Sequence, residues 1–382
     1  MPYLRLAALY FCYFAALGAV FPFWGLYLKQ KHGVSPLDIG ELMAILMATK
    51  TVAPNLWTAF TSNYDPITQV RIAAFLNWIS FLGIFWAQNF WQLALVIGLF
   101  GCFWHAVLPQ IEVITLSYLQ DQANNYSLIR LWGSIGFIVT VMVLSQASVN
   151  YGLQIVPITI LTLYVGLWIV SLSIPKRQFN TSDAVEIKLN DNILARNMLL
   201  VICFLMQVSH GAYYAFYSIY LEQYHYTNSI IGIFWILGVS AEIGIFLSMG
   251  RIMKYYGARN VVLISLGAAV LRWLLIGLLP EYFGILVMAQ VLHALTFGAF
   301  HAAAIHLVHR YFVGTEQSFG QALYSGVSFG AGGAVGSLIS GNLWVTYGAT
   351  ITFIAAASIA WAGMLLAWWY LESDKIKYYN YI

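Results

Sequence analysis

The chain has 382 residues, of which 61% are apolar and only 8% are charged. Its mean hydropathy is +0.77. A soluble domain carries about 25% charged residues, so this composition excludes a soluble globular protein and predicts an all-α integral membrane protein. The net charge of +3 comes without a basic stripe, and it gives no sign of a nucleic-acid partner.

Twelve apolar runs are long enough to span a membrane as helices, since a span needs about 20 residues. The sequence does not show the short alternating segments that are typical of membrane β-barrels. The first run is too long for a signal-peptide core and is kept as the first span. The runs lie near residues 5–28, 38–60, 70–88, 91–118, 128–148, 153–174, 196–221, 228–250, 259–279, 282–308, 318–342 and 346–371.

A polar insert divides these runs into six and six. It predicts an N-terminal six-helix bundle over residues 1–175, a cytoplasmic linker over residues 176–195 and a C-terminal six-helix bundle over residues 196–382. Transporters built from two bundles bind their substrate near mid-membrane, where the bundles meet. We therefore expect the site to draw side chains from both halves.

The loop charges predict the orientation of the chain. Lys29 and Lys31 fall on one side of the membrane, and a larger basic set falls on the other. Because cytoplasmic loops carry the excess of lysine and arginine, both termini are predicted to be cytoplasmic. The larger set comprises Arg5, Arg71, Lys176, Arg177, Lys188, Arg196, Arg251, Lys254, Arg259, Arg310, Lys375 and Lys377.

Five charged residues interrupt the apolar runs: Lys50, Glu112, Arg130, Glu242 and Arg272. A charge at the bilayer centre costs about 2.5 to 3.5 kcal/mol on insertion scales. Such residues generally face a cavity, pair with one another and belong to a transport pathway. Three cations against two acids leave one positive charge in surplus.

Glu112 and Arg130 lie on consecutive spans, equally far from a hairpin tip near Asp121. At about 1.5 Å per residue they are expected to lie level with each other. A buried ion pair that only fixes helix register is the alternative, but such pairs rarely add net stability, and we interpret the two as half of a substrate site. Lys50 has no acid nearby in sequence, so sharing Glu112 and contacting a substrate are both open to it.

In the second half, Glu242, Arg272 and His293 lie on three successive spans. A carboxylate whose pKa responds to burial and to a neighbouring arginine is suited to carrying a proton, and histidine changes charge near neutral pH. We interpret these residues as a proton-coupling group, with a static network as the alternative. His301 is interpreted as a packing histidine.

The seventh run carries His210, Tyr213 and Tyr217 at helical spacing, followed by two further tyrosines. Such a stripe belongs to a helix core or an interfacial belt in many membrane proteins. Here it passes through the middle of the span and begins with a histidine. A cavity wall that contacts substrate and a packed core are equally favoured.

The whole chain resembles the lactose permease branch of the major facilitator superfamily, and within it the 3-phenylpropionate permease group. The resemblance rests on seven stretches that are specific as a set: FPFW, SPLDIGELM, IRLWGSIGF, HGAYYAFYSIY, GVSAEIGIF, VLRWLLIG and VLHALTFGAFH. It implies a major facilitator fold of twelve transmembrane helices.

By this resemblance, Glu112 and Arg130 match the pair with which lactose permease holds its sugar, and Arg272 and His293 match its coupling residues. Two positions depart from that pattern. Phe137 replaces the tryptophan that stacks on the galactoside ring, and Thr296 replaces the proton-carrying glutamate. Galactoside transport is therefore disfavoured, and Glu242 becomes the candidate proton carrier.

The sequence predicts a proton-coupled symporter that carries a small organic acid of the phenylpropionate type across a bacterial inner membrane by alternating access. Lys50 and Arg130 are expected to hold the carboxylate, and Phe137 or the tyrosines to pack the body. A sugar or nucleoside symporter is the runner-up. A polytopic membrane enzyme lacks support because no loop carries a metal-binding acid cluster, and the loops are too short for a sensor domain. We expect a monomer that uses the proton gradient and no cofactor or metal.

Overall fold

The computed structural model describes residues 3–119, 126–176, 193–313 and 316–372, all of whose regular elements are helices. The predicted hairpin tip at Asp121, most of the 176–195 linker, and Arg177, Lys188, Lys375 and Lys377 lie outside these residues. The α-helices are α1 (Tyr3–His32), α2 (Pro36–Thr61), α3 (Pro66–Leu82), α4 (Phe90–Leu119), α5 (Tyr126–Tyr151), α6 (Ile155–Leu172), α7 (Ile193–Gln223), α8 (Asn228–Leu278), α9 (Phe283–Val291), α10 (Phe300–Tyr311), α11 (Glu316–Tyr324) and α12 (Gly333–Tyr370). The 3-10 turn η1 (Gly83–Phe85) and the π-helical segments η3 (Ala294–Ala299) and η4 (Ser325–Gly332) complete the set.

Within the described ranges, nine helical stretches are long and apolar enough to cross a membrane. Two of them each contain two spans, because the helical backbone turns at Gly257 (φ 73°) and at Gly348 (φ 84°). Positive φ is accessible to glycine without steric cost. With α2, which is less apolar because it carries Glu41 and Lys50, these helices supply the twelve predicted spans. The all-α membrane fold is confirmed.

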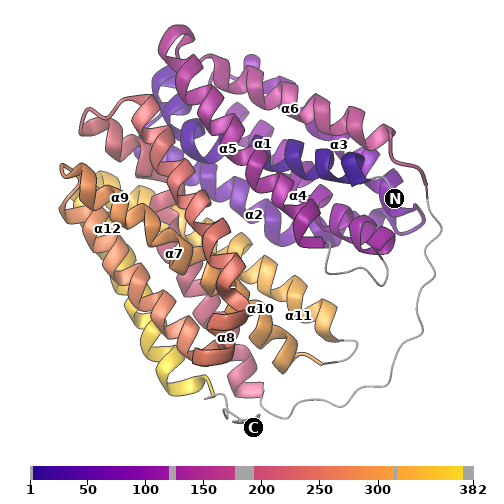
Figure 1. Cartoon of the computed structure of the whole chain (residues 1–382). Coiled ribbons are helices and arrows are strands. Elements are labelled where there is room, and N and C mark those ends of the chain that lie inside the picture. The colour runs from indigo at the N-terminus through magenta and orange to yellow at the C-terminus, as the bar shows by residue number, and fades with distance from the viewer. Residues whose placement is uncertain (1–2, 120–125, 177–192, 314–315, 373–382) are drawn as a thin grey trace.

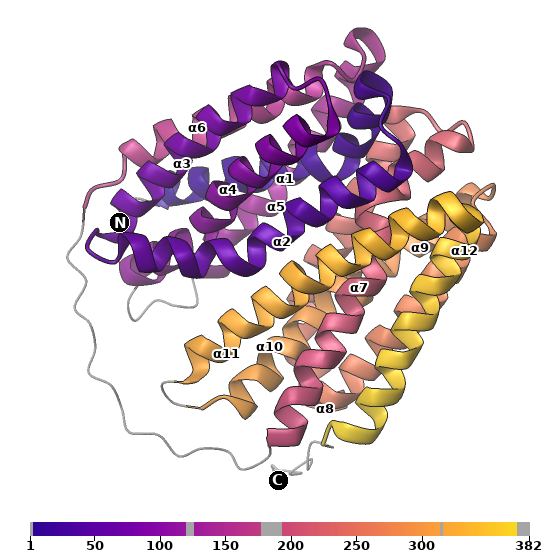
Figure 2. The ribbon, with the colours of Figure 1, turned by 180° about the vertical axis from the view of Figure 1, so that it is seen from behind.

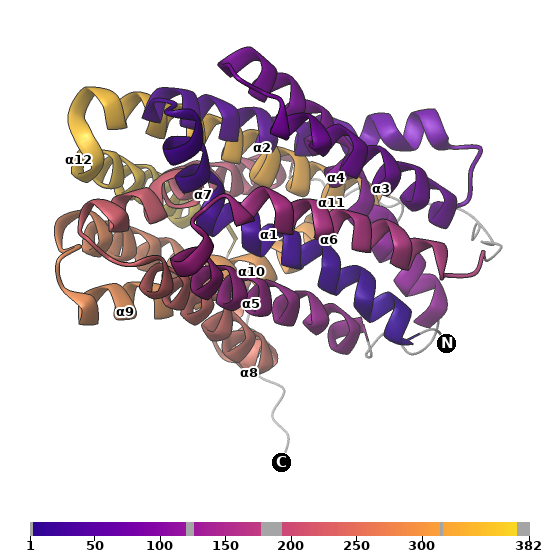
Figure 3. The same cartoon turned by 90° about the horizontal axis from the view of Figure 1, so that it is seen from above.

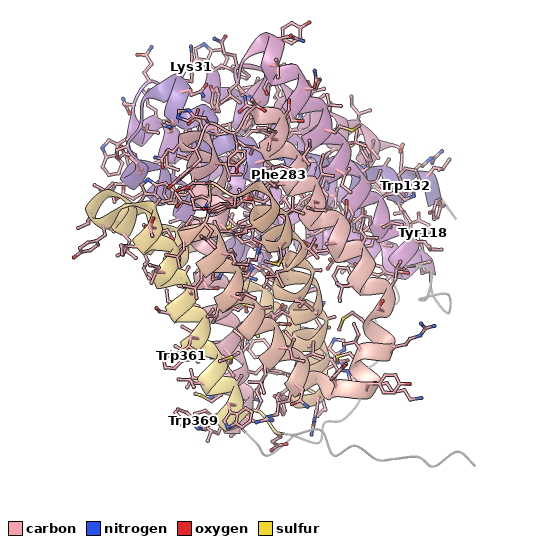
Figure 4. All side chains as sticks on the ribbon, turned by 60° about the vertical axis from the view of Figure 1, so that its left-hand side comes forward. Lys31, Tyr118, Trp132, Phe283, Trp361 and Trp369 are labelled. Atoms are coloured by element: carbon pink, nitrogen blue, oxygen red, sulfur yellow. The ribbon has the colours of Figure 1, made fainter. Side chains whose placement is uncertain are left out.

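The outer surface of the helices is apolar, as a lipid environment requires. Leu247, Phe60 and Trp91 are 86%, 80% and 79% exposed. Trp361 and Trp369 project from the outer face of α12 (Figure 4), and tryptophan is enriched where membrane helices meet the headgroups. Exposed apolar area on this scale is unfavourable in water and favourable in a bilayer.

The helices form two bundles. In the first, α1 packs along α5 and α6, and α4 packs along α2 and α3; in the second, α12 packs along α7 and α8. The bundles meet where α2 contacts η4 and α12, where α5 contacts α8, and where α1 contacts α7. In Figure 3 the outer helices α3 and α6 lie on the side away from α9 and α12.

The bundles are joined closely at one end. Lys29 Nζ at the end of α1 lies 2.6 Å from Glu222 Oε2 at the end of α7. Gly40 of α2 abuts Gly341 of α12 so tightly that a Cβ on Gly40 would come within 2.8 Å of the Gly341 Cα. From this closed end the ribbons diverge toward the end where α1 begins and α12 ends (Figures 1 and 2).

Three members of the larger basic set, Arg5, Arg71 and Arg259, lie at the diverging end, opposite Lys29. Arg5 donates to the carbonyl oxygen of Ser173 at 2.6 Å, Arg71 to Ile174 at 2.7 Å, and Arg259 to Leu371 at 2.8 Å. Each acceptor lies at or just beyond the C-terminal end of α6 or α12, where carbonyl groups lack helical partners and favour cations. This distribution agrees with the loop asymmetry read from the sequence.

Candidate functional site

The second bundle encloses a charged network around Arg272, whose side chain is completely buried in the part of α8 after Gly257. Its guanidinium donates to the Ala289 carbonyl oxygen at 2.9 Å, to Thr296 Oγ1 at 3.1 Å and to Gln290 Oε1 at 3.3 Å. Arg272 Nη1 also lies 2.8 Å from His293 Nδ1. Because a buried charge is tolerated only when it is well hydrogen-bonded, these contacts explain how Arg272 is retained in the bundle interior.

His293 connects this network to Glu242. The two side chains, 7% and 13% exposed, join through a 2.6 Å contact between His293 Nε2 and Glu242 Oε1. The π-helical segment η3 begins directly after His293, and π-bulges within α-helices are frequent at functional sites. The structure therefore brings together the three residues that the sequence singled out as a coupling group.

Glu242 also faces the first bundle. Its carboxylate interacts electrostatically with Arg130 as well as with Arg272. It is therefore reached by cations from both bundles, one on α5 and one on α8. The hydrogen-bonded chain from Arg272 through His293 ends on a carboxylate at the interface between the bundles.

Tyr213 and Tyr217 belong to the interior of the second bundle. The Tyr213 hydroxyl donates to Gln290 Oε1 at 2.9 Å, and Gln290 Nε2 donates to the Tyr217 hydroxyl at 2.7 Å. His210 is also fully buried, with Nδ1 2.8 Å from the Met206 carbonyl oxygen. None of the three side chains predicted to contact substrate from α7 is exposed in this conformation. They support the Arg272 network instead.

Sequence reasoning missed two residues here. Gln290 links both tyrosines to Arg272, yet an uncharged amide in an apolar run gives a weaker signal than a charge. Tyr214, which lies next to the α7 stripe and outside it, is half-buried, and its ring lies 4.8 Å from that of Phe21 in α1. The stripe's spacing indicates which residues share a face, but it does not indicate which face meets the other bundle.

In the first bundle, Arg130 rests on an aromatic ring. Its guanidinium carbon lies 3.8 Å from the centroid of Phe14. Gly133 makes room for it, since a Cβ there would come within 2.8 Å of Arg130 Nη1 and 2.7 Å of the Phe14 ring. The glycine one turn along α5 thus allows the guanidinium to lie over the Phe14 ring of α1.

Glu112 does not form a direct ion pair with Arg130 in the described part of the chain, where no nitrogen–oxygen contact of 4.0 Å or less joins them. Its carboxylate interacts electrostatically with Arg130 and, more weakly, with Lys50. It also interacts with the Tyr126 hydroxyl. The predicted proximity of the two charges is present, whereas their role in binding stays a prediction.

Lys50 lies halfway along α2, and its ammonium group is 4.6 Å from the ring centroid of Phe329 in η4. Among the described residues no carboxylate comes within 4.0 Å of it. Phe137 lies two turns after Arg130 on α5, and its side chain is only 5% exposed. Its backbone packs against Gly18, where a Cβ would meet the Phe137 carbonyl oxygen at 2.7 Å.

No cluster of three histidine, cysteine, aspartate or glutamate side chains able to hold a metal ion occurs in the described residues. What the arrangement offers is a set of half-buried charges at the junction of two bundles. Twelve spans in two bundles with charged side chains at their interface define a secondary transporter.

Comparisons with known proteins identify the family. The model of the MFS_1-like family matches residues 3–355, and the chain belongs to that family of major facilitator transporters. It is a multi-pass membrane transporter and not an enzyme. It is 28% identical, over 92% of its length and 93% of the relative's, to the "Probable 3-phenylpropionic acid transporter" of Escherichia coli strain K12. It is 24% identical to the maltose permease of Geobacillus stearothermophilus, over 94% of the chain and 92% of the permease.

The fold is that of a solved transporter. The crystal structure of the nucleoside transporter NupG superposes with a TM-score of 0.83, at 19% identity, covering 96% of this chain and 99% of that one. At 19% sequence identity, this structural similarity shows a shared fold and does not indicate the substrate.

Proposed function

We propose that this protein is a proton-coupled symporter for a small organic acid, and that it works as a monomer in a bacterial inner membrane with both termini cytoplasmic. In this orientation the closed end, with Lys29 and Glu222, faces the periplasm. The diverging end faces the cytoplasm, so the structure corresponds to an inward-facing state of an alternating-access cycle.

The proposal rests on the surroundings of the two intramembrane cations of the first bundle. Lys50 and Arg130 are half-buried, and each lies over an aromatic ring. A cation–π contact satisfies a cation less completely than charge-assisted hydrogen bonds to a carboxylate do. An anionic substrate entering between the bundles would supply those hydrogen bonds.

The charge count supports an anion in the same way. Lys50, Arg130 and Arg272 stand against Glu112 and Glu242, which leaves one positive charge in surplus. A bound carboxylate offsets one positive charge among these residues, whereas a neutral sugar or nucleoside does not. The relative described as a 3-phenylpropionic acid transporter points in the same direction.

On the proton side, Glu242 is the proposed carrier. Glu242 is the last member of the series of contacts that runs from Arg272 through His293, and its side chain is 13% exposed. It also interacts electrostatically with Arg130 across the interface between the bundles. Protonation of Glu242 removes its attraction for Arg130, while a substrate carboxylate on Arg130 replaces that attraction. Proton and acid are thereby linked through one arginine.

A sugar or nucleoside symporter is the second candidate, favoured by the similarity to the maltose permease and to nucleoside permease NupG of Escherichia coli strain K12, the latter at 24% identity over 63% of the chain. Uptake of labelled 3-phenylpropionate, lactose, maltose and uridine into proteoliposomes under an imposed pH gradient distinguishes the candidates. We expect gradient-driven uptake of the acid. Uptake of lactose, maltose or uridine without any response to the acid would refute the organic-acid proposal.

A further inference from the structure

A group of aromatic rings lies next to Lys50 and borders the Arg272 network, since the Phe297 ring stacks on that of His293 at 5.5 Å between centroids. We call it the Phe329 cluster, and it consists of Phe297, His301, Tyr324 and Phe329. His301 Nδ1 is 2.8 Å from the Tyr324 hydroxyl oxygen. Phe297, His301 and Phe329 are half-buried, whereas Tyr324 is only 2% exposed. Lys50 lies over the Phe329 ring and His301 interacts electrostatically with Arg130 and Lys50, so the cluster borders the same inter-bundle region as these cations.

Phe329 is held from three sides. Its ring centroid lies 5.9 Å from that of Phe297, 5.8 Å from that of His301 and 5.7 Å from that of Tyr324, with interplanar angles of 63°, 65° and 85°. Steep angles are the edge-to-face geometry that aromatic pairs prefer. Lys50 occupies a position over the face of the Phe329 ring, 4.6 Å from its centroid.

The backbone fixes α2 against the helix that carries Phe329. Thr51 Oγ1 donates to the Gly326 carbonyl oxygen at 3.1 Å. A Cβ on Gly330 would come within 2.7 Å of the Thr51 backbone nitrogen, so only glycine permits this approach. Phe329 itself lies in η4, and such π-helical turns recur at functional sites. The position of Phe329 relative to Lys50 is therefore set by packing between the bundles.

A carboxylate that binds Lys50 competes with the ring for the ammonium group. Charge-assisted hydrogen bonds are stronger than a cation–π contact, so the ammonium turns toward the carboxylate and the ring face becomes available. An aromatic group stacks on another at 4.5 to 7 Å between centroids. Lys50 Nζ and the Phe329 ring are 4.6 Å apart. An acid that binds Lys50 and stacks on Phe329 therefore needs only a short chain between its ring and its carboxylate.

We propose that Phe329 determines substrate specificity by offering its ring face to the aromatic ring of an acid whose carboxylate binds Lys50. This inference rests on the proposed organic-acid transport and adds to it the residue that selects an arylalkanoic acid over a non-aromatic one.

The test compares two acids that differ only in the π-face, 3-phenylpropionate and 3-cyclohexylpropionate, in proteoliposomes. For the wild-type protein we expect a KM about two- to tenfold lower for the aromatic acid, the range that an aromatic pair contributes beyond its buried area. Phe329→Leu keeps the apolar bulk, so it should bring the two KM values together while leaving the KM for 3-cyclohexylpropionate close to that of the wild type.

Two further variants control the comparison. Phe319→Leu makes the same change on α11 at a side chain that is 60% exposed, and it should leave the preference intact. Phe329→Trp keeps a π-face and should retain it as well. If Phe329→Leu still prefers the aromatic acid, or if the wild-type protein has equal KM values for the two acids, the role of Phe329 is refuted. The proposed organic-acid transport would still stand. Uptake of neither acid by the wild-type protein would overturn the proposed function, and with it this inference.

Discussion

Replacing Glu242 with glutamine tests the coupling mechanism directly. The amide has nearly the size of the carboxylate and keeps an atom that can bond to His293 Nε2, now 2.6 Å from Glu242 Oε1. It cannot take up or release a proton. We therefore expect Glu242→Gln to preserve the site while removing the exchangeable proton.

The charge count predicts which step fails. The empty, deprotonated carrier holds three cations and two carboxylates, a net charge of one. Adding one proton and one substrate anion restores the same net charge. In Glu242→Gln the loaded carrier matches the loaded wild type, whereas the empty carrier has an additional positive charge. Burying that charge is costly, so the return of the empty carrier should slow while exchange of bound acid continues.

The magnitude follows from the driving force. Each pH unit is equivalent to about 1.4 kcal/mol per proton, so a gradient of about two units supports about 100-fold accumulation of an acid carried with one proton. Above the level reached in liposomes without protein, Glu242→Gln should give no accumulation. Exchange of labelled for unlabelled 3-phenylpropionate by Glu242→Gln should stay within a few fold of the wild-type rate.

Glu41→Gln, near the start of α2, is the matched control, and it should accumulate the acid like the wild-type protein. Concentrative uptake by Glu242→Gln at the wild-type level would refute the assignment of Glu242 as the proton carrier. If Glu242→Gln loses both exchange and accumulation, Glu242 is needed for substrate binding. That result would contradict the charge count, which predicts that exchange continues.

Three other substitutions test separate parts of the structure. Arg272→Lys cannot reproduce the divergent hydrogen bonds of the guanidinium, so leaving buried acceptors unpaired should cost about 1 to 3 kcal/mol of unfolding free energy; an unchanged thermal unfolding curve in detergent would contradict this. Glu222→Gln removes the charge attraction to Lys29 at the closed end, and because this pair is 28% and 41% exposed it should shift the conformational equilibrium by no more than about fivefold, measured by energy transfer between dyes on the two bundles. Gly133→Ala should displace Arg130 and raise KM for the acid about tenfold or more, the equivalent of one charge-assisted hydrogen bond; an unaltered KM would show that Arg130 does not hold the substrate.

The span pattern was accessible from the sequence because it depends on composition over about 20 residues. The sequence separated the spans near residues 250–259 and 342–346. The structure keeps helical geometry there except at Gly257, inside the first gap, and its second turn falls at Gly348, just inside the predicted span 346–371. A single residue with positive φ leaves no trace in hydropathy. Other glycines and polar residues lie near each turn, so the sequence does not indicate which residue adopts positive φ.

The coupling group was accessible for a different reason. Glu242, Arg272 and His293 are each expensive in an apolar run, so they stand out individually, and the helix order places them in one bundle. Gln290 completes the same network but costs less to bury, so it does not stand out. The sequence therefore indicates which charges are kept, and the structure shows the neutral groups that hold them.

Contacts between the bundles were the least accessible part. Lys50 and Phe329 are far apart along the chain, and their contact depends on how the two bundles are oriented in this conformation. Hairpin geometry predicted that Glu112 and Arg130 would be level, and their charges do interact. It did not predict that Arg130 would rest on Phe14. Lys50 and Arg130, the two intramembrane cations of the first bundle, thus lie on aromatic faces, from which a carboxylate can draw them. This arrangement links anion binding to the contact between the bundles.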